Sequence, residues 1–240
     1  MMMEKIMANE MMDLEQLADY IQRDKREVTK LANRGHLPGR KVSGEWRFAR
    51  AEINQWLEAQ LPAYTEQQLK ALESRDVPAQ GEEPLIAGML ARTNIAVPLP
   101  ASTRASVLKE LVGLAEQSWH VYDPAAILEA IRQREEMGST ALESGVAIPH
   151  PRRPLPQALG DHILAYGRTA TGIPFGAAHG ALTDIFFLVC CQDESTHLRV
   201  LARLSRLLLL PGFMDALREA ATAVETWEVI DAAERGLSNV

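Results

Sequence analysis

The stretch "REEMGSTALESGVAIPHPR", residues 134–152, leads from a charged, helix-like run through a turn to a histidine between two prolines. The Gly-Ser-Thr sequence at 138–140 is typical of a turn, and the short apolar run after it is typical of a buried strand. His150 is therefore expected at the end of a strand, where Pro149 restricts the backbone just before it. Such a histidine is either a satisfied side chain at a strand end or a reactive group held in place.

Helix-like and strand-like segments alternate on both sides of this stretch. Amphipathic runs at residues 101–118 and 123–138 predict helices, the second opened by Asp123 as cap and Pro124 in the first turn. A longer amphipathic run and two further helices are expected toward the C-terminus. The strand candidates are short and bounded by turn signals, namely "NIAVPLP", "GVAIPH", "HILAYGR" and "ALTDIFFLVCC". This alternation predicts an α/β domain of several strands flanked by helices, over residues 85–240.

Length and composition fit a protein of two domains without a membrane span. The 240 residues are 47% hydrophobic and 24% charged, and no apolar run is long enough to cross a bilayer. The Met-rich start does not resemble a signal peptide, so residues 1–11 are expected to be a disordered lead-in. Cys190 and Cys191 are adjacent in an apolar run, which favours a reduced cytoplasmic protein over a disulfide or metal framework.

The net charge of −7 hides a basic segment near the N-terminus. Between Tyr20 and Arg50 there are nine lysines and arginines against three acidic residues. A segment of this kind is either a solvated charged face or a binding surface for a polyanion, and the local structure must decide between the two.

Local patterns place this basic segment on a small helical domain, residues 12–60. One helix is expected after the cap Asp13, and a second runs from the cap Asp24 to Gly35, which can close it in the left-handed conformation. Two short segments around Ser43-Gly44 predict a hairpin, and a third helix follows. This order of elements is typical of a winged helix-turn-helix.

The pattern "LADYIQRDKREVTKLANRGHLPGRKVSGEWRFARAEINQWL" resembles the excisionase-like and MerR-like DNA-binding domains. The resemblance implies that the second helix enters the major groove and that the hairpin forms a wing on the phosphates or in the minor groove. The alternative is that these charges only solubilise a small domain. Trp46 and Trp56 are expected in the core rather than stacked on bases. The DNA-binding candidates are Arg26, Thr29, Lys30 and Arg34 on the helix and Arg40, Lys41 and Arg47 on the wing.

Residues 61–84 are expected to link the two domains. The run "RDVPAQGEEP" contains proline, glycine and charge without apolar periodicity, although the residues just after Leu61 could continue as a helix. Such a linker permits independent tumbling of the domains as readily as signalling between them.

Three strings in the C-terminal domain resemble the enzyme IIA domains of the bacterial phosphotransferase system, of the fructose, mannitol and nitrogen-regulatory class. They are the opening stretch, "GIPFGAAHGALTDIFFLVC" and "ESTHLRVLARLSRLL", and the resemblance covers about residues 85–235. It implies a mixed sheet flanked by helices. It also implies that His150 accepts a phosphoryl group from a histidine phosphocarrier protein, with His197 beside it.

The residue types around His150 fit phosphoryl transfer. Imidazole is a nitrogen nucleophile whose pKa lies near neutrality, so a neutral fraction is available. Transfer also needs cationic and hydrogen-bonding groups around the phosphoryl oxygens, and Arg134, Ser139 and Thr140 are of the right kinds. Structural alternatives stay open, because His197 could cap its helix and Arg134 could complement the dipole at the end of another.

Two features of the sequence limit this interpretation. Ala141 and Glu143 stand where the family usually has glycines, and Glu143 is expected to bring negative charge near the site. The signatures of nucleotide-binding loops, serine hydrolases and metalloproteases are not found, so we expect no cofactor and no metal. A sugar-specific IIB or membrane IIC segment is not recognised either, so direct sugar uptake is not expected to be the protein's own activity.

Two functional hypotheses follow from the sequence. In the first, a phosphoryl carrier is phosphorylated on His150, and the change of charge alters how the attached domain engages DNA, which would regulate transcription. In the second, the protein is a DNA-binding regulator whose IIA-like domain is a non-phosphorylated sensor or dimerisation module. The expected partners are a histidine phosphocarrier protein and DNA; regulatory protein partners and a homodimer are left open, and no membrane partner is expected.

Overall fold

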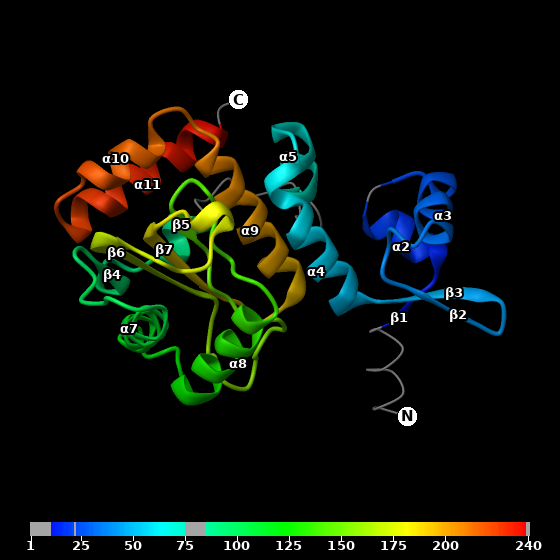
Figure 1. Ribbon diagram of the computed structural model, residues 1–240, viewed down its shortest axis with the longest axis horizontal. Coiled ribbons are helices and arrows are strands. Elements are labelled where there is room, and N and C mark those ends of the chain that lie inside the picture. The colour runs from blue at the N-terminus through cyan, green and yellow to red at the C-terminus, as the bar shows by residue number, and fades with distance from the viewer. Residues whose placement is uncertain (1–10, 22, 75–84, 239–240) are drawn as a thin grey trace. The chain divides into compact units, whose positions relative to one another are not determined.

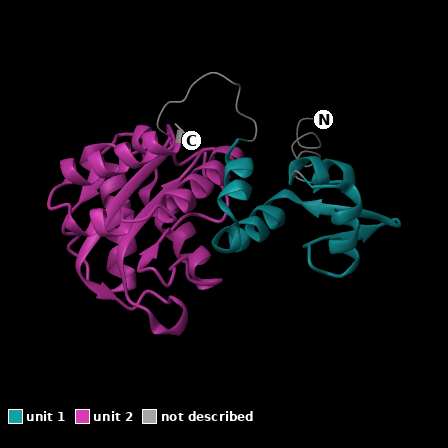
Figure 2. Cartoon of the chain, turned by 90° about the horizontal axis from the view of Figure 1, so that it is seen from above, with its two compact units in different colours: residues 1–75 teal, residues 76–240 magenta. Residues whose placement is uncertain are grey.

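The computed structural model describes residues 11–21, 23–74 and 85–238, and the chain divides into two compact units, residues 1–75 and 76–240 (Figures 1 and 2). The expected lead-in lies outside the described residues except for Met11, and so do the last ten residues of the expected linker. Within the described part of the chain, no helix is both long enough and apolar enough to cross a membrane.

The first unit contains short helices, three of which begin at a capping side chain. Its helical elements are α2 (Leu14–Tyr20), α3 (Lys25–Asn33), α4 (Arg50–Gln60), the 3-10 turn η1 (Leu61–Ala63) and α5 (Glu66–Glu73). The Asp13 carboxylate accepts hydrogen bonds at the start of α2, and Asp24 does the same for α3. Gly35 closes α3 with a φ of 71°, in the left-handed region. Both caps and the closing glycine confirm the sequence prediction, whereas α5 lies inside the segment expected to be linker.

The expected hairpin of the first unit is present and has a third strand beside it. Its strands β2 (Arg40–Val42) and β3 (Glu45–Ala49) are antiparallel, and Ser43 and Gly44 both have positive φ, 51° and 86°, as a tight two-residue turn requires. Strand β1 (Met11–Met12) pairs with the other edge of β3, so the sheet order is β1-β3-β2. Met11, expected in the lead-in, is therefore part of the sheet.

The core of the first unit is aliphatic with one central aromatic ring. Its fully buried side chains include Leu17, Val28, Phe48 and Ile53. The two tryptophans expected in this core are only half-buried: Trp46 stacks on Phe48, with ring centroids 5.8 Å apart, and Trp56 lies under the Arg23 guanidinium. The expectation that both tryptophans are core residues is therefore wrong in part, because Phe48 is the fully buried aromatic ring and both indole rings stay partly exposed.

The second unit has a four-stranded mixed sheet between two groups of helices, which confirms the predicted fold class. Its strands are β4 (Ile95–Ala96), β5 (Val146–Ala147), β6 (Ile163–Ile173) and β7 (Thr183–Cys190). Its helical elements are α6 (Leu85–Met89), η2 (Arg92–Asn94), α7 (Arg104–Glu116), α8 (Pro124–Glu136), η3 (Ala178–Gly180), α9 (Glu194–Leu208), α10 (Phe213–Glu219) and α11 (Ala223–Ser238). In Figure 1, α7 and α8 cover one face of the sheet, and α9, α10 and α11 cover the other.

The strand order β4-β6-β7-β5 places the two long strands in the middle. Strands β6 and β7 form an antiparallel pair, while β4 is parallel to β6 and β5 is parallel to β7. Alternate residues of the long strands face opposite layers, so Phe186 and Leu188 of β7 pack with Leu111 of α7 and Ile127 of α8 in one core. This core fixes the face of the sheet that α7 and α8 cover, and the short edge strand β5 leads to His150.

A buried carboxylate joins the first helix of this unit to the last. Glu234 of α11 accepts hydrogen bonds from the backbone amides of Leu85, Ile86 and Ala87, at 2.8 to 3.0 Å, and pairs with Arg203 of α9 at 2.8 Å. The Glu234 side chain is fully buried. Its charge is therefore compensated by three N–H dipoles and one guanidinium, which holds α6 against α9 and α11.

Candidate functional site

His150 lies where the parallel strands β5 and β7 both end. The register pairs Val146 with Ile185 and Ala147 with Phe186, and the Val189 amide donates a hydrogen bond of 3.0 Å to the Pro149 carbonyl. The pairing along β7 therefore continues up to the residue before His150. Two neighbouring strands thus fix the backbone that carries this side chain, as the sequence predicts.

A backbone hydrogen bond sets the orientation and the tautomer of the His150 ring. Its Nδ1 lies 2.7 Å from the Ile148 carbonyl oxygen. A carbonyl oxygen can only accept, so Nδ1 carries the proton and donates it. In the neutral ring the nucleophilic lone pair is therefore on Nε2.

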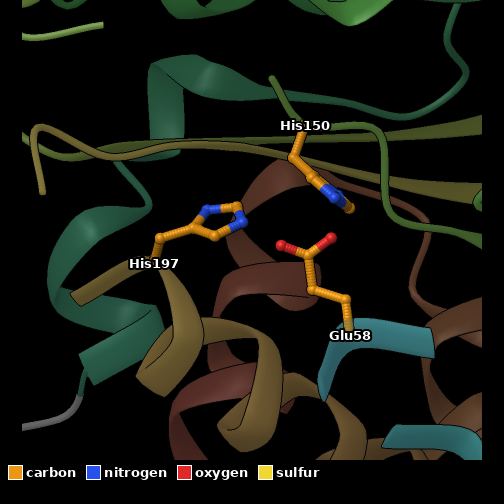
Figure 3. A group of neighbouring side chains, drawn as sticks. All are labelled: Glu58, His150 and His197. Carbon is orange, nitrogen blue, oxygen red and sulfur yellow. The ribbon is translucent and has the colours of Figure 1, made fainter. Parts of the chain in front are cut away.

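His197 lies next to His150, so the structure brings together the two histidines that the sequence places in the site (Figure 3). Their ring centroids are 5.0 Å apart, with an angle of 59° between the ring planes. His197 is in the first turn of α9, and the N-cap of this helix is Asp193, which accepts a hydrogen bond of 2.8 Å from the Thr196 amide. The capping position is thus taken by Asp193, and His197 is not the N-cap.

Ser139 and Thr140 lie on a segment that runs antiparallel to the approach to His150. Ala141 forms a bridge with Ala147, and the Ile148 amide donates to the Thr140 carbonyl at 3.4 Å. The Ser139 hydroxyl donates to the Phe175 carbonyl at 3.0 Å, and the Thr140 hydroxyl donates to the Glu135 carboxylate. Each hydroxyl has one hydrogen, so both are directed to protein acceptors here, and their contact with a phosphoryl group stays a prediction.

An ion pair with a buried carboxylate and a half-exposed guanidinium lies behind this segment and was missed by the sequence reasoning. The Glu135 side chain, 2% exposed, pairs with Arg104 at 2.6 Å, and the same guanidinium nitrogen donates to the Glu135 carbonyl at 2.6 Å. Arg104 begins α7 and Glu135 is in the last turn of α8, so the pair ties these helices together. The available signal was an acidic residue in the last turn of a helix, where the dipole disfavours it unless a cation is near.

The arginines near the opening stretch have different positions. Arg134 is in the last turn of α8 and donates to the Gly138 carbonyl at 3.0 Å, which fits the structural alternative of a cation at a helix C-terminus. Its contact with a phosphoryl group stays a prediction. Arg152 and Arg153 follow His150 and are exposed.

Residues 140–142 run antiparallel to residues 146–148, and we call this pair the β5 hairpin. Glu143 lies at the opposite end of the β5 hairpin from His150. The Gly145 carbonyl accepts from the Ile185 amide, and the Pro149 carbonyl accepts from Val189, so the two ends are separated by four residues of β7, roughly 13 Å of extended chain. Glu143 is exposed and pairs with His179 at 3.4 Å. The expectation that Glu143 brings negative charge near the site is therefore wrong, because the hairpin directs it away and solvent screens it.

The tip of this hairpin requires glycine at 145. Gly145 has a φ of 90°, and a Cβ there would meet the Arg218 guanidinium at 2.8 Å. Arg218 pairs with Asp184 at 2.9 Å and donates to the Ser144 carbonyl at 3.0 Å, and the hydrogen bond to Asp184 raises its pKa. The far end of the β5 hairpin is thus clamped to α10 and β7.

The other histidines and the cysteines are placed as structural or exposed groups. His162 accepts a hydrogen bond from the Gln192 amide, whereas His36, His120 and His179 are exposed. Burial raises the pKa of Cys190 to about 12 and raises that of Cys191, so both thiols stay protonated and unreactive near neutral pH.

Some of the DNA-binding candidates of the first unit interact with other groups of that unit, and others do not. Thr29 is half-buried and its hydroxyl donates to the Lys25 carbonyl at 2.6 Å. On the hairpin, Arg47 pairs with Glu45 at 2.7 Å, and the Lys41 ammonium lies 5.2 Å from the centroid of the Trp46 ring. The candidates that are exposed and form no side-chain hydrogen bond or ion pair within the described residues are Arg26, Lys30, Arg34 and Arg40.

The two units match two different protein families. Residues 89–233 match the family described as "Phosphoenolpyruvate-dependent sugar phosphotransferase system, EIIA 2", and residues 11–61 match the family described as "Helix-turn-helix domain". Each match lies within one of the two compact units, and the two families agree with the two resemblances drawn from the sequence.

Individual relatives agree with the larger of these matches. A nitrogen regulatory protein of Pseudomonas aeruginosa is 28% identical over 142 residues, which cover 58% of this chain and 90% of that protein. The fructose-specific EIIABC component of Bacillus subtilis is 26% identical over 148 residues, which cover 61% of this chain but only 23% of that protein. The crystal structure of nitrogen regulatory protein IIA-Ntr from Neisseria meningitidis has the same fold, with a TM-score of 0.55, 24% identity, and coverage of 61% of this chain and 99% of that one.

Proposed function

The chain belongs to the EIIA 2 family of the phosphoenolpyruvate-dependent sugar phosphotransferase system, and on this basis we propose that it carries a phosphoryl group on Nε2 of His150. The donor is a histidine phosphocarrier protein. The observation that carries the proposal is the 2.7 Å hydrogen bond from Nδ1 of His150 to the Ile148 carbonyl, because it leaves the lone pair on Nε2.

The transfer needs little covalent chemistry from the protein beyond this nucleophile. The lone pair on Nε2 attacks the phosphorus, the bond from phosphorus to the donor imidazole breaks, and that imidazole leaves with the bonding electrons. The Nδ1 proton stays on the hydrogen bond to Ile148 throughout. His197, with its ring centroid 5.0 Å away, is suited to donate a hydrogen bond to a phosphoryl oxygen.

Phosphorylation with identification of the modified nitrogen tests this proposal. The protein labelled with 15N in its histidines is incubated with phosphoenolpyruvate and the general phosphotransferase proteins, and phosphorus–nitrogen couplings are measured by NMR. We expect one acid-labile phosphate per chain, coupled to Nε2 of His150. Wild-type protein that takes up no phosphate, or that carries it on Nδ1, would contradict the proposal.

We propose further that the first unit binds duplex DNA through α3 and the hairpin. Arg26 and Lys30, two of the exposed cations on α3, form no ion pair with the described residues, whereas Lys25 pairs with Glu15 at 3.4 Å. The hairpin supplies Arg40 at its start, and the tight turn at Ser43 and Gly44 keeps its tip narrow. In this arrangement α3 lies in the major groove and the hairpin contacts phosphates beside it.

Replacing two exposed cations of α3 that have no ion-pair partner within the described residues tests the DNA interface. Arg26→Ala with Lys30→Ala should weaken binding to a promoter fragment and reduce the slope of log affinity against log salt by about 2, about one for each phosphate that is no longer neutralised. The matched control is Arg152→Ala with Arg153→Ala, which removes the same charge from the other unit and should leave the slope unchanged. Equal effects of the two double variants would mean that only net charge matters.

We propose that these two activities regulate transcription together in the cytoplasm, with the phosphorylation state of His150 altering DNA or partner binding. The support is the presence of a phosphotransferase domain and a helix-turn-helix domain in one chain. The second hypothesis, in which the IIA-like unit is a non-phosphorylated sensor or dimerisation module, predicts DNA binding that does not respond to phosphoenolpyruvate.

A further inference from the structure

We propose that Glu135 is a positioning residue for the phosphoryl acceptor. Its buried carboxylate holds the Ser139-Thr140 segment, which holds the backbone of Ile148, and the Ile148 carbonyl sets the His150 ring with its lone pair on Nε2. This inference deepens the proposed function and rests on it for its consequence, although the tautomer that it concerns can be measured without phosphorylation.

The first link is the set of donors around the Glu135 carboxylate. It accepts hydrogen bonds from the Thr140 amide, at 3.3 Å and 3.4 Å to its two oxygens, from the Thr140 hydroxyl, and from Arg104 at 2.6 Å. Because the side chain is only 2% exposed, water cannot replace these donors at low cost. The start of the segment is therefore held by a buried charge and three N–H or O–H donors.

The second link runs from Thr140 to the imidazole. The Thr140 carbonyl accepts from the Ile148 amide at 3.4 Å, and the Ala141–Ala147 bridge fixes the register beside it. Ile148 then uses its own carbonyl, 2.7 Å from Nδ1, to accept the ring proton of His150. Glu135 is thus connected to the His150 ring through Thr140 and Ile148: the Thr140 carbonyl holds the Ile148 amide, and the Ile148 carbonyl holds the ring.

Arg104 closes the network on its other side. Its guanidinium lies 5.4 Å from the centroid of the Phe175 ring, and the Phe175 carbonyl accepts the Ser139 hydroxyl at 3.0 Å. The two hydroxyls predicted to contact the phosphoryl group are therefore both used by this network. Their role in the proposal is to hold the segment in place.

Removing the charge of the Glu135 carboxylate should make the orientation of the His150 ring less well fixed while the protein stays folded. In Glu135→Gln one oxygen is replaced by an amide nitrogen, which repels the Thr140 and Arg104 donors. The Ile148 carbonyl is then less well placed, and a larger fraction of neutral His150 should carry its proton on Nε2, where it blocks attack. We expect the phosphorylation rate to fall about 10- to 100-fold, as is typical when a reacting group is misplaced by about 1 Å.

The test compares Glu135→Gln with Glu136→Gln, the exposed neighbour on the same helix. The readouts are the 15N shifts of the His150 ring, which report the tautomer, and the phosphorylation rate. We expect a shift toward the Nε2–H tautomer and a slower rate in Glu135→Gln only, with partial recovery in Glu135→Asp.

An unchanged His150 tautomer in folded Glu135→Gln would overturn the inference, even if wild-type protein is phosphorylated. Failure of wild-type phosphorylation would instead contradict the proposed function and leave the tautomer result to decide on Glu135. If Glu135→Gln does not fold, Thr140→Val removes one donor to the carboxylate at constant shape, and the same tautomer measurement then decides.

Discussion

Replacement of His150 by glutamine is expected to abolish phosphorylation completely. Glutamine is similar in size to histidine, but its amide nitrogen has no available lone pair and cannot attack phosphorus. The proposed nucleophile is Nε2 of His150, because Nδ1 of this ring donates to the Ile148 carbonyl. His197 lies beside His150 but on a different element, and we do not expect it to replace His150 as the acceptor. Acid-labile phosphate should therefore fall to background in His150→Gln.

The matched control is His179→Gln, because His179 is exposed and pairs with Glu143 at the far end of the β5 hairpin. This variant should be phosphorylated like wild type. Phosphate that persists in His150→Gln would show that another residue is the acceptor. The same pair of variants separates the two functional hypotheses: if the units are coupled, phosphoenolpyruvate together with the general phosphotransferase proteins changes DNA affinity in His179→Gln but not in His150→Gln.

Replacement of Glu234 by glutamine is expected to lower the unfolding free energy of the second unit by about 3–5 kcal/mol. The reason is that the largely buried guanidinium of Arg203 then has no carboxylate partner. The Arg203 side chain is 12% exposed and pairs with Glu234, and three backbone amides of α6 donate to the same carboxylate. Glutamine keeps one acceptor oxygen and places an N–H group toward these donors. The loss of stability should therefore be accompanied by faster hydrogen exchange at Leu85, Ile86 and Ala87.

Urea denaturation followed by circular dichroism measures the stability, with Glu228→Gln as control. Glu228 is on the same helix and is exposed, so the same chemical change should alter stability by less than about 0.5 kcal/mol. Equal denaturation midpoints for the two variants would mean that the contacts of the Glu234 carboxylate do not stabilise the second unit.

Local signals made much of the fold predictable from the sequence. A capping side chain lies within three residues of the amides that it binds, so Asp13, Asp24 and Asp123 marked the starts of three helices correctly. The turn at Ser43 and Gly44 was also predictable, because its signal lies in two adjacent residues. The strand that leads to His150 was recognised from a short apolar run bounded by turn residues.

Long-range contacts were not predictable in this way. Arg104 and Glu135 are 31 residues apart, and no periodicity relates them. Strand β1 is two residues long and exists only because β3 lies beside it. The error over Glu143 has the same origin, because nearness in sequence suggested nearness in space, whereas the hairpin register sends residues 143 and 150 to opposite ends. The neighbour of His150 on α9 came from a family resemblance alone.

The lengths of the strands in the second unit also bear on how copies of the protein can associate. Its 11-residue and 8-residue strands are in the centre of the sheet, and each edge strand has two residues. Moreover, the outer side of β5 is partly covered by the bridge from Ala141 to Ala147. A sheet with such short borders offers little backbone for recruiting a foreign strand, which limits aggregation. A homodimer of this unit should accordingly form through helices or loops rather than by joining two sheets into one.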